Sequence, residues 1–132
     1  MSFTITNPPA LHDPVPFGYS HLAMVTSGRL VLVAGQYASD EHGQVVSPDF
    51  AVQVDRSLAN LGTALRAAGA DYPDVVQIRT FVVDHRPERL TVIAEAVRRI
   101  WGDRPPTQTL VGVAALALPG MLFEIDAVAV RP

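Results

Sequence analysis

The segment Leu122–Val130 alternates so regularly between two kinds of side chain that it constrains the fold more than any other feature of the chain. One set of alternate positions is wholly apolar: Phe123, Ile125, Ala127 and Ala129. The other set carries two carboxylates among apolar neighbours: Leu122, Glu124, Asp126 and Val128. Because successive side chains of a strand point to opposite faces, the apolar set is expected to meet a helical layer. The mixed set then lines either a cleft or a contact with another subunit.

A second segment, Val75–Val83, predicts the same arrangement. It is rich in β-branched residues, with Val76, Ile78 and Val82 on one side and with Gln77, Arg79, Phe81 and Val83 on the other. We expect a sheet face of this mixed composition to be covered by other copies of the chain, with Asp126 as a salt-bridge partner at the contact.

Two segments have helical periodicity. The first is expected to open at Ser47–Asp49, with a capping side chain, a proline at the first helical position and an acid near the positive helix end. Its apolar positions recur at helical spacing, and Gly69 stops it: Val54, Leu58, Leu61, Leu65 and Ala68. The second helix is expected over about Pro87–Trp101, with one apolar stripe.

The remaining segments complete a prediction of one α+β domain over residues 1–132. A buried strand is expected over Gly28–Tyr37, paired as a hairpin with His21–Thr26, followed by a polar loop over residues 38–47. Two closing strands are expected near Thr109–Ala117 and Leu122–Val130. Both helices are expected on one face of the sheet.

Composition excludes several classes of function. A net charge of −3 and ten scattered basic residues argue against a nucleic-acid surface. The absence of cysteine excludes disulfides and thiolate chemistry. The four histidines have no metal-binding spacing, so no metal is expected. No apolar run is long enough to span a membrane, and the first residues lack the basic region and apolar core of a secretory signal, so a cytoplasmic location is expected.

Several motifs, in their order along the chain, resemble those of the RidA (YjgF) family. They include Phe17-Gly18-Tyr19-Ser20, Val31–Gln36, the helical segment with Asn60-Leu61 and Leu65–Ala70, Asp74–Val76 with Phe81–Asp84, Pro106–Val113 and Leu122–Asp126. The resemblance implies a chorismate-mutase-like mixed sheet of about six strands with two helices on one face. It also implies a homotrimer with three small-molecule clefts between subunits. Enzymes of the family hydrolyse enamines and imines derived from amino acids, such as 2-aminoacrylate, without metal or cofactor.

The resemblance also assigns candidate site residues, with one departure at the substrate end. Glu124 matches the glutamate that holds the attacking water, Tyr19 matches a cleft tyrosine, and the backbone of Ala34 and Gly35 matches a pocket wall. Gln108 stands where the family deaminases have the arginine that grips the substrate carboxylate. Thr107 or Thr109 could take that position if the register between Gln108 and Glu124 shifts by one residue, and neither is basic.

The loss of that arginine bears on substrate choice. Hydrogen bonds to charged groups contribute roughly 1.5–3 kcal/mol and neutral ones about 1 kcal/mol, so anionic substrates are expected to bind about tenfold or more weakly. Arg79 or Arg104 could restore a cation. The family's pocket asparagine on the second helix also has no counterpart, since Val92 and Ala94 lie in that region.

Two functions therefore follow from the sequence. The first is a cofactor-free hydrolase of imines, enamines or related small molecules, with Glu124 as the catalytic residue and with Tyr19, Ala34, Gly35, Gln108 and Thr109 binding substrate. The 2-aminoacrylate and 2-iminopropionate deaminase activity is expected to be weak or absent. The second is a non-catalytic trimer that binds a small metabolite or a protein partner in the same clefts. A ribonuclease is disfavoured by the acidic composition.

Overall fold

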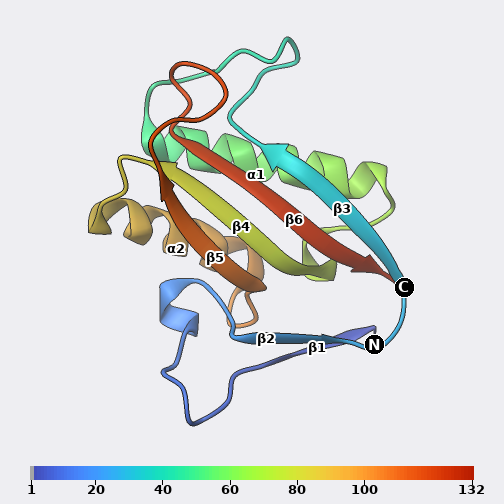
Figure 1. Ribbon diagram of the computed structural model, residues 1–132. Helices are drawn as coiled ribbons and strands as arrows, with labels where there is room; N and C mark the ends of the chain where they lie inside the picture. The colour runs from blue at the N-terminus through green and yellow to red at the C-terminus, as the bar shows by residue number, and fades with distance from the viewer. Residues whose placement is uncertain (1) are drawn as a thin grey trace.

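The computed structural model describes residues 2–132 as a layered α+β protein (Figure 1). Its elements are, in chain order, β1 (Phe3–Thr6), η1 (Val15–Phe17), β2 (Leu22–Val25), β3 (Arg29–Gln36), α1 (Phe50–Ala67), η2 (Tyr72–Asp74), β4 (Val75–Val83), α2 (Pro87–Trp101), β5 (Thr107–Val113) and β6 (Phe123–Arg131).

The main sheet is mixed and has the strand order β3-β6-β4-β5. The β4–β5 pair is parallel, whereas β6 is antiparallel to both β3 and β4. Both helices lie behind this sheet in Figure 1, and within residues 2–132 no helix covers its other face. This open face is the one that carries Glu124 and Asp126. The predicted class, six strands with two helices on one face, is confirmed.

The core forms where the sequence periodicity placed it. The apolar side of β6 (Phe123, Ile125, Ala127 and Ala129) is buried against the apolar stripes of both helices, including Leu61 and Leu65. The predicted helix end also holds, because Gly69 has φ +76° and follows the last turn of α1. Burial of this one face of β6 leaves its other face, with Glu124, free for chemistry or contact.

The predicted cap of α1 was wrong by two residues. The Asp49 carboxylate, not Ser47, caps the helix by accepting from the Val52 amide at 3.0 Å. Pro48 therefore lies before the helix. Ser47 instead forms a local turn, its hydroxyl accepting from the Asp49 amide at 3.1 Å. Asp49 is the more favourable cap, because its side chain accepts a hydrogen bond from a helix N–H and also places a negative charge at the positive helix end.

The predicted hairpin between His21–Thr26 and the following strand is also wrong. β2 pairs with β1, a strand that the sequence analysis did not predict, and β3 pairs with β6. Residues 2–27, here called the N-terminal arm, thus form a separate small sheet that crosses below the main sheet in Figure 1. Gly28, with φ +102°, turns the chain between arm and sheet, and a Cβ there would lie 2.6 Å from a Val130 methyl.

The last two strands are shifted from their predicted bounds. β5 ends at Val113 rather than Ala117, and β6 begins at Phe123. Gln53 explains the irregular segment between them. Its fully buried amide donates to the carbonyl oxygens of Ser47 and Gly120, both at 2.8 Å, and accepts from the Leu122 amide at 2.8 Å. These hydrogen bonds replace the strand pairing that the segment lacks.

Within residues 2–132, no helix has the length and apolar character needed to cross a membrane.

Candidate functional site

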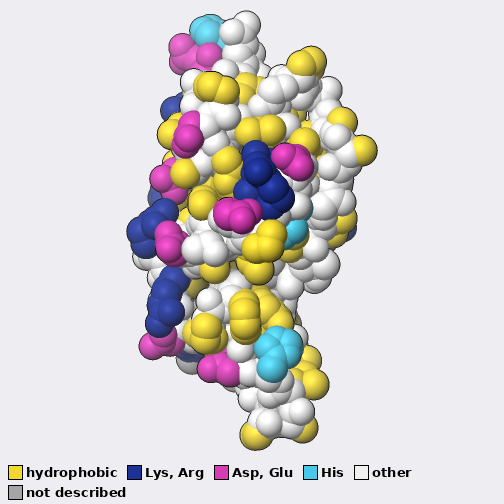
Figure 2. Space-filling model, turned by 90° about the vertical axis from the view of Figure 1, so that its left-hand side faces the viewer, with side chains coloured by type: hydrophobic (Ala, Val, Ile, Leu, Met, Phe, Trp, Pro, Cys, Tyr) yellow, Lys and Arg dark blue, Asp and Glu magenta, His cyan; other side chains and the backbone are white. Residues whose placement is uncertain are grey.

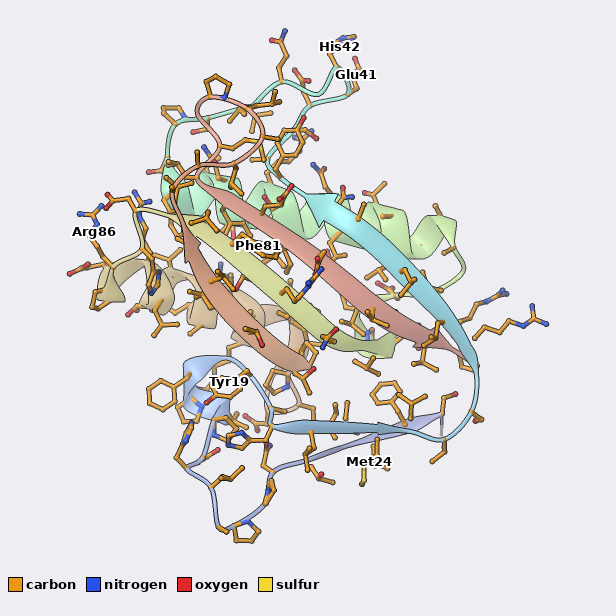
Figure 3. The ribbon with its side chains drawn as sticks, viewed as in Figure 1. Tyr19, Met24, Glu41, His42, Phe81 and Arg86 are labelled. Atoms are coloured by element: carbon orange, nitrogen blue, oxygen red, sulfur yellow. The ribbon has the colours of Figure 1, made fainter. Side chains whose placement is uncertain are left out.

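The structure divides the predicted site residues between the two faces of the main sheet. Gln108 pairs in register with Ile78, which is buried under the helices, so the Gln108 side chain lies on the helix side. Glu124 lies on the open face beside its pairing partner Phe81, which Figure 3 shows on the face toward the viewer. Phe81 also pairs with Val111, three residues beyond Gln108 along β5. One chain therefore does not bring Gln108 and Glu124 together.

Tyr19, Gln108 and Thr109 do come together, in a cleft between the N-terminal arm, β5 and α2. This Gln108 cleft has a volume of about 710 Å³ and is lined by His12, Phe17, Tyr19, Leu90, Gln108, Thr109 and Leu110. None of these residues is Asp, Glu, Lys or Arg. The walls thus combine three apolar residues with four uncharged polar or titratable ones, His12, Tyr19, Gln108 and Thr109.

The amide of Gln108 is engaged with the protein itself. Its Oε1 accepts from the Thr80 hydroxyl at 2.9 Å, and its Nε2 donates to the Gly18 carbonyl oxygen at 2.8 Å. Thr80 is fully buried, so this pair ties the cleft wall to the core. Gln108 consequently positions the Tyr19 segment and retains one N–H and further acceptor capacity for a ligand.

A second cavity of about 530 Å³ lies on the other side of Tyr19, between the arm and the main sheet. It shares Tyr19, Gln108 and Thr109 with the Gln108 cleft, and its walls include Ser20 and Gln77. Ser20 is 2% exposed and its hydroxyl oxygen has no partner within the described chain.

Glu124 and the Ala34–Gly35 pair form a second group on the open face. The β3–β6 register shifts between Val33 and Gln36, so Ala34 and Gly35 lie in an irregularity beside β6. A Cβ on Gly35 would lie 2.7 Å from Cδ and from Oε2 of Glu124. The absence of a side chain at Gly35 is therefore what allows the Glu124 carboxyl group to lie against the β3 backbone.

Burial raises the pKa of the Glu124 carboxyl group, and the nearby Asp126 carboxylate raises it further. Both causes disfavour the charged form, because one removes water and the other adds a like charge. A carboxyl group whose pKa moves toward neutrality is better suited to exchange protons with a bound water.

The two candidate cations, Arg79 and Arg104, lie away from the Gln108 cleft. Arg79 lies on the open face and is paired with Asp126, its Nε lying 3.1 Å from both carboxylate oxygens. Asp126 thus has its partner within the same chain. Arg104 is exposed beyond the end of α2 and lines neither cavity described above. Within residues 2–132, neither arginine brings its charge to the Gln108 cleft.

Sequence reasoning missed the contribution of the arm. His12 was interpreted only as a histidine without metal spacing, yet it lines the Gln108 cleft and contacts Tyr19. Gly18 has φ +87° and packs on α2, where an added Cβ would lie 3.0 Å from the Ala94 Cα. That close contact accounts for a small residue at position 94, where the family asparagine was sought. The Gly18 motif was visible in the sequence, but its contact with α2 was not.

Comparisons with known proteins agree with this architecture. Residues 12–131 match the family model described as endoribonuclease L-PSP. The chain is 36% identical to the RutC family protein YjgH of Escherichia coli over 86% of this chain and 85% of that one. It is 31% identical to the human 2-iminobutanoate/2-iminopropanoate deaminase over 86% of this chain and 80% of that one.

A solved structure of similar form has been described as a Rid family protein of unknown function, YyfB, from Yersinia pestis. It superposes with a TM-score of 0.94 at 41% identity, covering 99% of this chain and 100% of that one. The arm is included in that range. A structure of YjgH, by contrast, superposes with a TM-score of 0.70 at 33% identity, although it covers 100% of this chain.

Proposed function

The chain belongs to the RidA (YjgF) family, and from that premise we propose that it is a trimeric, cofactor-free hydrolase of small imines or enamines. The reaction takes place in clefts between subunits. Each cleft combines the Tyr19–Gln108 group of one subunit with the Gly35–Glu124 group of the next.

The observation that carries this proposal is that each chain holds two partial sites on opposite faces of its sheet. The tyrosine and the amide lie in one cleft without a carboxyl group, and a carboxyl group of raised pKa lies on the open face outside that cleft. A neighbouring subunit over the open face would join them. Leu30 and Leu32 on that face are 64% and 75% exposed, which supports coverage by another copy.

The chemistry follows from these groups. Glu124 holds a water and takes a proton as the water oxygen bonds to the carbon of the C=N group. The C–N bond then breaks, so that an imine and water give a carbonyl compound and ammonia. Tyr19 and the remaining N–H of Gln108 orient the substrate.

We expect the substrate to be neutral or at least to lack an α-carboxylate. The Gln108 cleft has no permanent charge among its lining residues, so a carboxylate would lose its hydration without gaining an ion pair. Several relatives are named as 2-iminobutanoate/2-iminopropanoate deaminases, and their substrates are anions. This chain is therefore expected to hydrolyse such substrates weakly.

The test is a coupled ammonia-release assay with 2-iminopropanoate and with a neutral ketimine. Wild type, Gln108→Arg and Glu124→Gln are compared. We expect wild type to prefer the neutral compound, Gln108→Arg to gain about tenfold or more on 2-iminopropanoate, and Glu124→Gln to lose both activities. Strong wild-type hydrolysis of 2-iminopropanoate would contradict the role assigned to the neutral cleft.

The alternative is a trimer that binds a metabolite or a protein in the same clefts without turning it over. Under this alternative Glu124→Gln changes affinity alone, and wild type releases no ammonia from either compound. Ribonuclease activity, which the family model's description names, is disfavoured by the net charge of −3. Cleavage of single-stranded RNA by the purified chain would reverse that judgement.

A further inference from the structure

The N-terminal arm builds a cluster of rings next to the Gln108 cleft. His12 lies at its centre, with its Nε2 2.5 Å from the phenol oxygen of Tyr19. Edge-to-face contacts join the His12 ring to Phe17, Tyr19 and His21, with centroid separations of 6.1, 6.0 and 4.9 Å. Figure 2 shows histidine side chains beside hydrophobic ones in the lower part of that view.

This cluster is held in place by hydrogen bonds that fix an otherwise irregular segment. Nε2 of His21 lies 2.9 Å from the His12 carbonyl oxygen, and the His21 amide donates to the Asn7 side chain at 2.7 Å. The Ser20 amide donates to the Pro106 carbonyl oxygen at 3.0 Å, next to the start of β5. With Gln108 holding Gly18, the residues on both sides of Tyr19 are anchored to the cleft wall.

Tyr19 and His12 differ in burial, and a proton relay requires one group inside the cleft and the other in contact with solvent. Tyr19 is half-buried and lines the cleft, whereas His12 is exposed to solvent. The hydrogen bond between them therefore connects the interior of the cleft to bulk water through two groups that can each give and take a proton.

Other charged or titratable groups lie near this segment, but none is hydrogen-bonded to the phenol oxygen within residues 2–132. The Asp13 carboxylate accepts from the Val15 amide at 3.1 Å. From α2, Glu95 and Arg98 line a groove on the far side of Phe17 and Leu90. His21 contacts the backbone of His12. His12 is thus the group positioned to exchange a proton with Tyr19.

We propose that His12 and Tyr19 form the proton relay of the cleft, an assignment that rests on the proposed hydrolase function. Glu124 first passes the proton that it took from the attacking water to the imine nitrogen, which gives a carbinolamine. As the C–N bond of this carbinolamine breaks, the leaving nitrogen takes the Tyr19 hydroxyl proton and departs as ammonia, and the carbinolamine hydroxyl gives its proton to Glu124 as the C=O bond forms. His12 returns a proton to the phenolate oxygen and is itself reprotonated by solvent water. Glu124 releases the proton of the carbinolamine hydroxyl to solvent, so the cycle gains no net proton. Tyr19 is thus a second catalytic residue beside Glu124, and His12 acts through Tyr19 as a positioning and proton-supplying residue.

The experiment uses the full chain with benzophenone imine, an uncharged ketimine, as the probe. Its conversion to benzophenone and ammonia is followed in wild type, His12→Ala, Tyr19→Phe, the double variant and His42→Ala. His42 is the matched control, because it lies at a loop tip far from Tyr19 in Figure 3. A general acid contributes about 10²- to 10⁴-fold, so we expect kcat to fall at least about tenfold in His12→Ala and Tyr19→Phe.

Imidazole added to the buffer separates a proton-transfer role from a structural one. We expect it to restore kcat in His12→Ala, with little change in KM, and to leave Tyr19→Phe and the double variant unchanged. Loss of activity in His12→Ala without rescue would overturn the relay in favour of a structural role for His12. Full activity in His12→Ala would overturn the relay and leave the hydrolase assignment intact. If wild type hydrolyses neither benzophenone imine nor 2-iminopropanoate, both the relay and the hydrolase assignment are overturned.

Discussion

At the scale of single residues, Glu124 combines a favourable position for chemistry with a cost to stability. Burial and the Asp126 carboxylate raise the pKa of its carboxyl group, so the folded chain disfavours the ionised form. The unfolded chain has no such bias. At low pH the carboxyl group is neutral in the folded and the unfolded chain, and the free energy of unfolding is unaffected. As the pH rises through the raised folded-state pKa, the group ionises more readily in the unfolded chain, so the free energy of unfolding falls.

This linkage gives a prediction for Glu124→Gln. The variant and wild type should have similar free energies of unfolding near pH 4, and the variant should become the more stable as the pH is raised toward 8. Urea unfolding at a series of pH values measures this difference. Glu41→Gln, at an exposed loop tip, is the control. An advantage for wild type at pH 8 would mean that a cation from a neighbouring subunit pairs with Glu124 after all.

At the scale of elements, the irregularity in β3 matters because it lets the Glu124 carboxyl group approach the backbone. We predict that Gly35→Ala displaces this flexible side chain and strongly lowers imine hydrolysis, with a smaller effect on the melting temperature. Gly112→Ala in β5 is a suitable control, since its new Cβ would meet the nearest atom at an ordinary 3.5 Å. Equal activity in the two variants would contradict the placement of Glu124 against Gly35.

The elements also show what the sequence could predict. The helical stripe of α2 and the alternation of β6 depend on local periodicity, and both elements were predicted almost to their ends. The arm was not, because β2 is four residues long and its choice between β1 and β3 as a partner depends on tertiary contacts such as Gly18 against α2.

The candidate site was likewise predictable only where it depends on local periodicity. Alternation put Glu124 on the mixed face of its strand, but the face that Gln108 occupies follows from its register with Ile78. His12 precedes Tyr19 by seven residues of irregular chain, where no periodicity indicates that the two side chains meet.

At the scale of the whole molecule, we expect the open face to determine the assembly. Leu30 and Leu32 are exposed there, and Phe81 and Val128 are half-buried on the same face. We predict that sedimentation finds a trimer at micromolar concentration and that Leu32→Glu dissociates it, because a charge would be buried without a partner. Val52→Glu, at an exposed apolar position on α1, should leave the trimer intact. A stable wild-type monomer would exclude coverage of this face by other subunits.

Subunit complementation tests the central claim most directly, because that claim is that each site combines parts of two chains. Glu124→Gln and Tyr19→Phe trimers, both expected to have low activity, would be unfolded together, refolded as a mixture and assayed with benzophenone imine. Native mass spectrometry would verify mixed trimers. We predict that activity reappears in the mixture, since some clefts then pair an intact Tyr19 with an intact Glu124 from the neighbouring chain. Mixed trimers no more active than the two parents would contradict a site shared between subunits.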